Sequence, residues 1–553
     1  MRFLLFIKNT IHIFKVIYNY KTFNKKYSHN IKNSKGIIFI EFNSFISVHP
    51  FLSLLANFFS EKFNYEIKCY DNYILTTKDF DISFFNKIKS IIGEKFDLKT
   101  WGIYRSFGVT EFIRPHRLKI DIDTEDFLSN IFSNLKTKND IFKIKYKNIL
   151  IGDLIYDGYL KFYNTYTIEL NDSVFKNYVK DFILLARFWD EYFLKNNVKF
   201  IVGCHPYYSY GLIFRIGLLH GINCYYCIAG KIYYLTPNRI FGNLHYLDYK
   251  IDYSNIRNNQ KEAALLEAKK SLEARFSGKL GSIIKDIVPT RSAYHSNYRV
   301  NKKVLNKNEK IKILISTHQL GDCYYAYGAN LFPDFFEWLM FLSKISEVTD
   351  YDWYIKDHPP YDKLKIIKSF NRTYELSKNL CRNNKRFTYL DPSISHHQII
   401  NEGINFVLTI YGSVAFEYAY QGIPVLTASN NCSTRPYNFN IHSDSIQDYE
   451  DKLKKLSQLN FKIDKKEVLE YFFMHQIYND PDCLMEEYTS FLDNNKILDD
   501  YDTWKFYEFW INKVNYNKIV TMKKILEKFY DSKDYTLNLS HNLDRFTKIL
   551  LKS

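Results

Sequence analysis

The sequence predicts an α/β protein built from two Rossmann-like lobes and a helical C-terminal tail. Short β-rich runs alternate with amphipathic helical segments along most of the 553 residues, as in parallel sheets with helical crossovers. The stretch 289–310 interrupts this alternation because it is polar, basic and almost without apolar periodicity, so we expect a domain boundary there. With 46% hydrophobic residues, the chain can fill the cores of two such lobes.

The first lobe is expected over residues 31–290, after a basic amphipathic helix over residues 1–30. Its predicted strands are 36–42, 65–70, 148–151, 199–203 and 223–228, and its predicted helices are 50–63, 173–196, 210–220 and 260–275. The opening helix carries Lys8 and Lys15 and lacks a small-residue cleavage site, so it is neither a signal peptide nor a membrane span. We expect it either to lie on the inner leaflet of a membrane or to pack on its own domain.

A linker over residues 291–310 leads to the second lobe, which is expected over residues 311–490. Its predicted strands are 312–317, 352–356, 386–390, 405–410 and 423–428, and a helix is predicted over 333–345. Residues 491–553 are expected to form a helical tail. The aromatic cluster within this tail is expected to dock it onto the core rather than to bind a ligand.

Composition and charge narrow the possible partners. The formal charge of +16 permits nucleic acid, an anionic membrane face or phosphorylated substrates. No basic-aromatic RNA motif or compact arginine cluster is present, so we expect no nucleic-acid partner. The eight cysteines form no disulfide framework, which favours a reducing, cytoplasmic compartment. Cys224 and Cys227 form a CxxC inside a predicted buried strand, where core packing is expected rather than metal binding.

The segment 405–428 is the most informative part of the chain. A β-rich run is followed by the small-residue turn Tyr411-Gly412-Ser413, by helical spacing up to Gly422 and by a second strand. Backbone N–H groups at the start of a helix, together with the Ser413 hydroxyl, suit a nucleotide phosphate. Glu417, one turn further on, is then expected to face a ribose hydroxyl pair. The alternative is an ordinary turn with a serine N-cap.

A second motif lies about fifty residues upstream. The strand predicted over 352–356 leads into Asp357, His358 and two prolines. Ligands of open α/β sheets bind at the carboxyl ends of strands, and the prolines would hold the imidazole there. By itself His358 is typical of a surface loop. Paired with Ser413 on the next-but-one strand of the same sheet, it is predicted to contact a phosphate.

These motifs resemble those of capsule and surface-polysaccharide glycosyltransferases of the GT-B type, relatives of bacterial polysialyltransferases and capsule Kdo transferases. Lys356-Asp357-His358-Pro359 resembles the family's Lys-x-His-Pro, and residues 411–425 resemble its Gly-[Ser/Thr]-x-x-x-Glu and Gly-x-Pro-Val. Further similarity lies in Ser316-Thr317-His318 with Asp322, in residues 331–339 and in residues 151–157. The resemblance covers about residues 145–460.

The resemblance implies that His358, Gly412 and Ser413 hold the donor nucleotide, often a CMP-linked acidic sugar, with Glu417 at its ribose or base. Lys356 and Asp322 are placed in the same donor site, and no metal or other cofactor is expected. Asp357 departs from the pattern, because a carboxylate near a phosphate is unfavourable unless it points away or carries a proton. Either Lys356 or Arg435 would supply the compensating positive charge.

Transfer of a sugar requires a base that accepts a proton from the acceptor hydroxyl. Three candidates follow predicted strands: Asp153, His205, and His318 with Asp322 nearby. Each has a structural alternative, since Asp153 suits a turn cap, His205-Pro206 a rigid loop and His318 a local hydrogen bond. His318 could also contact the donor instead.

The leading hypothesis is therefore a cytoplasmic glycosyltransferase on the inner membrane face. It would move a sugar from a nucleotide sugar to a growing surface polysaccharide or a lipid-linked glycan. The alternatives are a nucleotide-sugar epimerase or a polyol-phosphate transferase of the same fold, and a non-catalytic subunit of a glycan-assembly complex.

Overall fold

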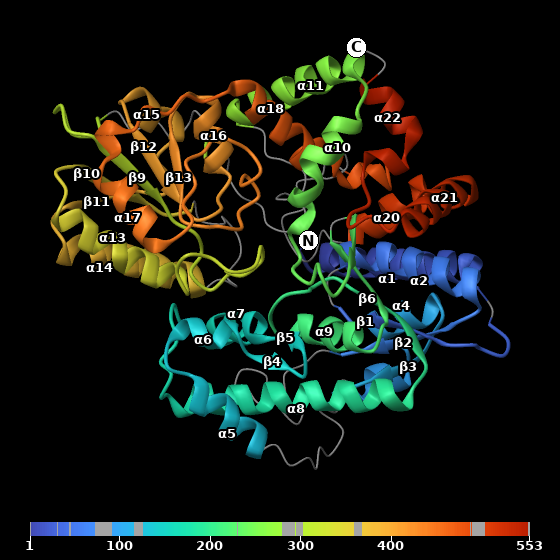
Figure 1. Cartoon of the computed structure of the whole chain (residues 1–553). Helices are drawn as coiled ribbons and strands as arrows, with labels where there is room; N and C mark the ends of the chain where they lie inside the picture. The colour runs from blue at the N-terminus through green and yellow to red at the C-terminus, as the bar shows by residue number, and fades with distance from the viewer. Residues whose placement is uncertain are drawn as a thin grey trace.

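In this computed structural model, the described residues form two large β-sheets, each covered by helices, and one two-stranded sheet (Figure 1). The structure describes residues 2–29, 31–43, 46–71, 91–115, 125–228, 230–278, 293–294, 302–358, 368–486, 488 and 504–550. The sheets and the helical C-terminal region confirm the predicted α/β class with two Rossmann-like lobes.

The first sheet has the strand order β3-β2-β1-β6-β7-β8. Its strands are β1 (Ile37–Glu41), β2 (Glu66–Tyr70), β3 (Val109–Ile113), β6 (Val198–Gly203), β7 (Asn223–Ile228) and β8 (Lys231–Leu235). All neighbours pair in parallel except β7 and β8. The chain runs outward from β1 to β3 and then returns to the other side of β1 with β6. The topological switch point, where open α/β sheets bind ligands, therefore lies between the carboxyl ends of β1 and β6.

The described helices of the first lobe are α2 (His49–Phe63), α4 (Lys99–Ser106), α5 (Glu125–Asn134), α6 (Lys138–Phe142), α7 (Gly152–Tyr163), α8 (Ser173–Lys195) and α9 (Leu212–Leu219), with a 3-10 turn η3 at Tyr208–Gly211. Three of the predicted helices, over 50–63, 173–196 and 210–220, are present close to their predicted bounds, whereas the helices α4 to α7 of the first lobe were not predicted. Cys224 and Cys227 are fully buried in β7, as predicted. Two strands of the sheet, β3 and β8, were not predicted. The strand predicted over 148–151 is only half of a two-stranded hairpin, β4 (Lys145–Tyr146) and β5 (Ile149–Leu150).

The second sheet is entirely parallel, with the order β11-β10-β9-β12-β13. Its strands are β9 (Lys312–Ser316), β10 (Asp352–Lys356), β11 (Phe387–Leu390), β12 (Phe406–Thr409) and β13 (Val425–Thr427). Its helices are α13 (Phe335–Glu347), α14 (Lys368–Asn383), α15 (His396–Asn401), α16 (Val414–Tyr420), α17 (Ile446–Lys454) and α18 (Lys465–Phe472). The switch point of this sheet lies between β9 and β12.

Segments from both ends of the chain pack together on the first lobe. Figure 1 shows the C-terminal helices α20 (Trp504–Lys513) and α21 (Tyr516–Ser532) beside α1 (Arg2–Tyr27) and α2. Tyr20 stacks on Tyr507 with ring centroids 4.0 Å apart, and Phe51 contacts Trp510 at 5.4 Å. The aromatic residues of the tail therefore dock it onto the core, as predicted. No helix in the described part of the chain combines the length and apolar character needed to cross a bilayer.

A helical connection joins the lobes. It contains η4 (Leu244–Asp248), α10 (Tyr249–Asn255) and α11 (Asn258–Phe276), and α11 packs against α18 of the second lobe and against α22 (Leu543–Leu550). A helix that the sequence assigned to the first lobe thus contacts the second. Residues 291–292 and 295–301 of the predicted linker, and residues 359–367, lie outside the described residues.

Candidate functional site

The switch point of the second sheet holds an imidazole against a glycine turn. His318, two residues after β9, places Nε2 3.2 Å from the Thr409 hydroxyl at the end of β12. A Cβ atom on Gly412 would lie only 2.9 Å from Thr409 Oγ1 and 3.2 Å from the His318 ring, so this approach requires glycine. The ring of Phe335 stacks on His318 at 4.9 Å and fixes its position. The carboxyl ends of β9 and β12 therefore meet around His318.

His358 reaches the same edge of the sheet from β10. Its side chain is exposed, and its backbone carbonyl accepts a hydrogen bond from the Tyr374 hydroxyl at 3.0 Å. Burial and, next in size, the neighbouring His358 lower the pKa of His318 to about 3. His318 is therefore a neutral imidazole at physiological pH, and it stands between His358 and the turn that contains Ser413. The structure thus brings together the two motifs that the sequence paired.

Ser413 occupies the N-cap position of α16, as the alternative interpretation expected, but it does not cap the helix with its side chain. Its side chain is exposed, its backbone is already helical, and its hydroxyl makes no capping hydrogen bond. Within the described chain, the Ser413 and Val414 amides donate no hydrogen bond. An exposed hydroxyl and two amides without an acceptor among the described residues thus lie beside His318, which suits the oxygens of a phosphate.

Glu417 faces the connection between the lobes rather than the turn. Its carboxylate is buried and accepts hydrogen bonds from Arg275 Nε at 2.7 Å and from the Tyr294 hydroxyl at 3.1 Å. The helix α11 supplies Arg275, so Glu417 ties this connection to α16. Its predicted contact with a ribose stays a prediction, and such a contact would have to share the carboxylate with Arg275.

The structure resolves the difficulty that Asp357 posed. Its buried carboxylate accepts hydrogen bonds from the Thr317 and Ser377 hydroxyls at 2.6 and 2.7 Å. Burial raises the pKa of Asp357, which favours the protonated, neutral form of its carboxyl group. Lys356 is also buried, and its ammonium donates to the Pro392 carbonyl at 2.9 Å. Burial lowers the pKa of Lys356 to about 8.

The two residues proposed to compensate a phosphate charge are therefore both engaged elsewhere. The Lys356 ammonium donates a hydrogen bond to the Pro392 carbonyl, and Arg435 forms an ion pair with the exposed carboxylate of Asp444. Within the described chain, the groups that remain at the edge are the imidazoles, the Ser413 hydroxyl and backbone amides.

Asp322 lies where the two lobes meet. It accepts hydrogen bonds from two residues of the first lobe, the Tyr208 hydroxyl at 2.6 Å and Lys161 Nζ at 3.2 Å. Burial by itself would raise the pKa of Asp322, but Lys161 and Tyr208 outweigh it and lower the pKa. Asp322 is therefore a carboxylate near His318, held by cross-lobe hydrogen bonds that the sequence did not predict.

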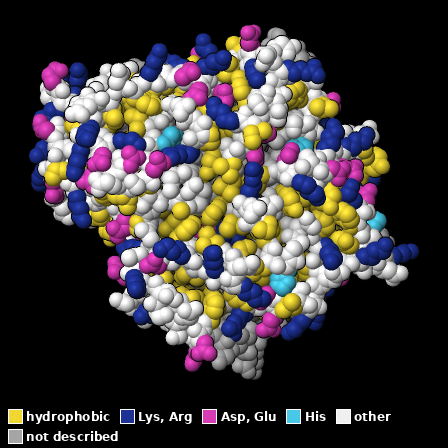
Figure 2. Space-filling view, in the orientation of Figure 1, with side chains coloured by type: hydrophobic (Ala, Val, Ile, Leu, Met, Phe, Trp, Pro, Cys, Tyr) yellow, Lys and Arg dark blue, Asp and Glu magenta, His cyan; other side chains and the backbone are white. Residues whose placement is uncertain are grey.

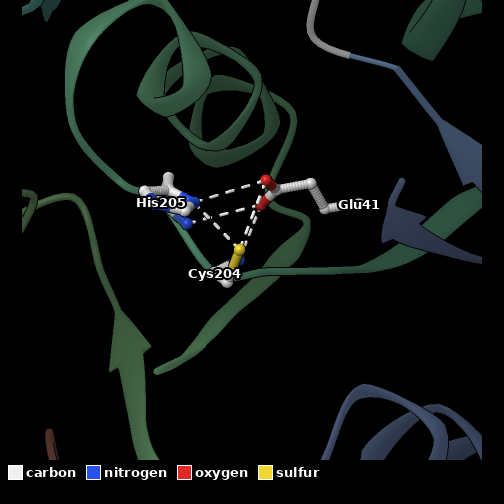
Figure 3. A group of neighbouring side chains, drawn as sticks. All are labelled: Glu41, Cys204 and His205. Atoms are coloured by element: carbon white, nitrogen blue, oxygen red, sulfur yellow. Dashed lines mark hydrogen bonds and ion pairs between the residues drawn. The ribbon is translucent and has the colours of Figure 1, made fainter. Parts of the chain in front are cut away.

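The switch point of the first sheet holds a second polar cluster, Glu41, Cys204 and His205 (Figure 3). Glu41 ends β1, and the other two residues follow β6. The Glu41 carboxylate accepts a hydrogen bond from the Cys204 amide at 2.6 Å and lies 3.5 Å from Nδ1 of His205. The sulfur atom of Cys204 lies 2.9 Å from the same nitrogen. Burial would raise the pKa of Glu41, but His205 and the Cys204 amide lower it overall. Glu41 is thus an ionised partner for the imidazole.

This cluster can orient a base, as carboxylate–imidazole pairs do. Because Glu41 faces Nδ1, Nε2 is the nitrogen through which His205 would take up a proton. Sequence reasoning selected His205 but missed Glu41. The available signal was a carboxylate directly at the end of a fully apolar strand, β1.

The same three side chains are the group closest to a metal site among the described residues, with ligand atoms within 4.8 Å of one another. Their chemistry favours a hydrogen-bonded cluster instead. The Asn43 amide donates to Glu41 Oε1 at 3.0 Å and to Cys204 Sγ at 2.8 Å, so an N–H group points at two of the three ligands. Burial raises the pKa of the Cys204 thiol, which disfavours the thiolate that a metal needs. The expected absence of a metal stays a prediction.

Asp153, the remaining candidate base, occupies a different environment from the one expected. It lies in the first turn of α7, is buried, and pairs with Arg215 through contacts of 2.6 and 3.2 Å. Arg215 is itself buried. Because removing one partner of a buried pair is strongly destabilising, this arrangement indicates a structural role. An acceptor hydroxyl has no access to a carboxylate held in this way.

Aromatic rings connect the two clusters across the lobe boundary. The ring of Tyr210 lies 5.5 Å from His205, and Phe162 lies 6.2 Å from both Tyr210 and Tyr208. Tyr208 in turn bonds to Asp322. Figure 2 shows hydrophobic side chains gathered across the middle of this face, where the lobes meet, with Lys and Arg around them.

Comparisons with known proteins identify no family for this chain. No protein-family model matches it, and no curated protein matches it. Among solved structures, UDP-GlcNAc 2-epimerase from Methanocaldococcus jannaschii is 13% identical over 78% of this chain and 97% of that chain, with a TM-score of 0.25. A UDP-forming α,α-trehalose-phosphate synthase from Burkholderia vietnamiensis is 9% identical over 87% of this chain and 100% of that chain, with a TM-score of 0.23.

A third solved structure, the N-terminal domain of Candida albicans trehalose-6-phosphate phosphatase, is 8% identical over 90% of this chain and 98% of that chain, with a TM-score of 0.27. Structural similarity at such low TM-scores does not support a conclusion about the fold or function of this protein. The fold assignment therefore rests on the sheet topology, and the resemblance to capsule glycosyltransferases stays a prediction.

Proposed function

We propose that this protein is a glycosyltransferase that uses a nucleotide-sugar donor. The observation that carries the proposal is that each sheet places an imidazole at its switch point and that both switch points adjoin the lobe boundary. His318 and His358 lie at the edge of the second sheet, and His205 with Glu41 lies at the edge of the first. Donor and acceptor could then meet between the lobes.

The second lobe would hold the donor phosphate. His358, the Ser413 hydroxyl and the amides of Ser413 and Val414 are donors that can stabilise the charge developing on the leaving phosphate. Gly412 permits the close approach of this turn to His318. Neutral His318 would position the donor through a hydrogen bond rather than through charge.

The first lobe would activate the acceptor. As the acceptor oxygen attacks the anomeric carbon, the bond from that carbon to the donor phosphate breaks, and the hydroxyl proton passes to His205 Nε2. The Glu41 carboxylate stabilises the imidazolium that forms. We propose a lipid-linked or polysaccharide acceptor at the inner membrane face, and CMP-linked acidic sugars as the first donors to test.

A nucleotide-sugar epimerase is the second candidate, and Asp322 is the observation that favours it. Epimerisation needs an acidic or basic side chain beside the donor sugar and no acceptor. Asp322 is an ionised carboxylate near His318, where the sugar of a bound donor would lie. A requirement for an acceptor separates the two reactions.

The test begins with thermal shifts of the full-length protein against CMP, UDP and GDP, since a ligand that binds the native state raises the melting temperature. We expect one nucleotide to stabilise the wild type. His358→Ala and Ser413→Ala should each weaken that binding about tenfold, the loss of roughly 1.4 kcal/mol, with the fold intact. His12→Ala, an exposed histidine on α1, is the control.

Turnover then distinguishes the reactions. Release of nucleotide that depends on an added acceptor supports the transferase, whereas conversion of the donor sugar without acceptor identifies the epimerase. Unchanged nucleotide affinity in both variants would refute the donor assignment. A wild type that binds none of the three nucleotides would point to a non-catalytic subunit.

A further inference from the structure

A polar cavity of about 570 Å³ opens between the end of β8, the helix α10 and the chain that follows α21. Its volume is in the usual range for small-molecule sites. None of its lining residues belongs to the clusters at the two switch points. The proposed transfer reaction therefore leaves this cavity without a role.

Two buried polar atoms on the cavity wall lack protein partners. Thr536 Oγ1 and His245 Nδ1 make no hydrogen bond in the described part of the chain, although their side chains are only 4% and 6% exposed. Burying such groups unpaired costs free energy, and native proteins rarely leave them so. Both atoms have almost no accessible surface in this structure, so a polar ligand in the cavity would reach them after a small shift of the neighbouring side chains.

The charges around the cavity largely compensate one another. Arg239 forms a two-point ion pair with Asp248, and its Nη2 lies 2.6 Å from one carboxylate oxygen. Asp534 lies 3.1 Å from His541, and Lys533 Nζ lies 3.7 Å from the centre of the Tyr530 ring. A phosphate would meet several carboxyl groups here, and an organic cation would meet Arg239 and Lys533.

The fifth charged residue on the wall, Asp252, stands apart from these pairs. Burial first, and then the nearby Asp248 and Asp534, raise its pKa to about 7. Near neutral pH it can both donate and accept a hydrogen bond, according to its protonation state. This versatility suits a hydroxyl group, which also does both.

We propose that the cavity binds a neutral sugar residue. A sugar offers several adjacent hydroxyls, and the carboxyl, amide and hydroxyl groups of Asp252, Asn255 and Thr536 present donors and acceptors for them. The sugar could arrive free or within a glycan chain, because the hydroxyl chemistry is the same.

Saturation-transfer NMR with the full-length protein tests this site. The probes are glucose, galactose and N-acetylglucosamine, each as the free sugar and as its methyl glycoside. We expect at least one probe to bind. Binding of the glycoside as well as the free sugar would identify a residue within a glycan, whereas binding of the free sugar alone would identify a free monosaccharide.

Thr536→Val is the decisive variant because it removes Oγ1 and preserves the volume of the side chain. Since Oγ1 has no protein partner, the melting temperature should stay the same or rise, whereas the affinity for the probe should fall at least tenfold. Asp252→Asn should weaken binding as well. Asp531→Asn, an exposed aspartate near the cavity but outside its wall, should have no effect.

Three outcomes would overturn the proposal: none of the six probes binds, Thr536→Val binds as tightly as the wild type, or the signal disappears in His358→Ala and Ser413→Ala. The last result would place the sugar at the lobe boundary. Failure of all nucleotides to bind would remove the transferase but would leave the sugar site standing, so the two proposals can fail separately.

Discussion

Glu41 and His205 are 164 residues apart in the chain, yet they form the best-organised acid–base pair at the lobe boundary. Each lies at the carboxyl end of a strand, and the two strands are neighbours in the sheet. The backbone amide of Cys204 fixes one oxygen of the carboxylate, so the group cannot rotate away from the imidazole. Glu41 is thus a positioning residue, and His205 is the group that would touch the acceptor.

Glu41→Gln tests this role at the residue scale. Glutamine keeps an oxygen for the Cys204 amide but cannot stabilise an imidazolium by charge. We expect kcat to fall about 100-fold or more, as for loss of general base catalysis, while KM for the donor stays the same. Glu262→Gln, an exposed change on α11, should leave both constants unaltered. A rise in donor KM with normal kcat would contradict the assignment.

At the scale of elements, α1 has two apolar faces. Val16 and Tyr20 are buried, and the helix packs against α4 and α20. Ile11, Phe14 and Tyr18 are 61%, 67% and 70% exposed and follow one another at helical spacing. The helix therefore packs on its own domain and still presents an apolar stripe beside the exposed Lys15. This arrangement suits the surface of an anionic membrane.

Phe14→Asp tests the exposed face of α1. The added carboxylate should be repelled by anionic lipid and should not enter the interface, so binding to vesicles of phosphatidylglycerol and phosphatidylethanolamine should weaken about tenfold. Co-sedimentation with the vesicles measures it. Val348→Asp is a matched control, since Val348 is equally exposed on the second lobe. If the wild type does not sediment with vesicles, or if both variants lose binding equally, α1 is not a membrane surface.

At the scale of the whole molecule, buried histidines connect stability to pH. His49 joins the first lobe to the tail, with Nδ1 2.6 Å from the Tyr507 hydroxyl and Nε2 2.7 Å from the Asn43 carbonyl. Burial lowers its pKa to about 4, and burial likewise lowers the pKa of His442 to about 4 and of His475 to about 3. These imidazoles are neutral in the folded protein.

The unfolded chain takes up protons on these histidines below about pH 6.5, whereas the folded chain does so only near pH 4 or lower. The contribution of these histidines to stability should therefore be constant above pH 7 and should fall as the pH drops from about 6.5 towards 4. His49 alone would account for roughly 3 kcal/mol of that loss, since one pKa unit corresponds to about 1.4 kcal/mol.

Melting temperatures between pH 5 and 8 measure this dependence. His49→Gln should give a shallower pH profile, because glutamine does not titrate. His12→Ala, which removes an exposed imidazole, should leave the slope unchanged. A wild-type profile that is flat from pH 8 to pH 5, or one that His49→Gln does not alter, would show that the buried histidines do not control stability.

The sequence by itself determined the alternation of strands and helices, the burial of the CxxC strand, the docking of the aromatic tail and the placement of His358 and Ser413 after parallel strands of one sheet. Each of these follows from local information. Apolar periodicity specifies the element, and parallel strands of one sheet end at one edge. The sequence also anticipated that Asp357 had to turn away or be protonated.

Only the tertiary structure decided which distant residues meet. Asp153 and Arg215 form a buried pair, Glu417 bonds to Arg275, and Glu41 orients His205, because strand order and lobe packing bring them together. The spacing of side chains along the sequence does not reveal the strand order or the packing of the lobes. The sugar cavity depends on it most, since its walls come from parts of the chain that lie hundreds of residues apart and become neighbours when the tail folds back onto the first lobe.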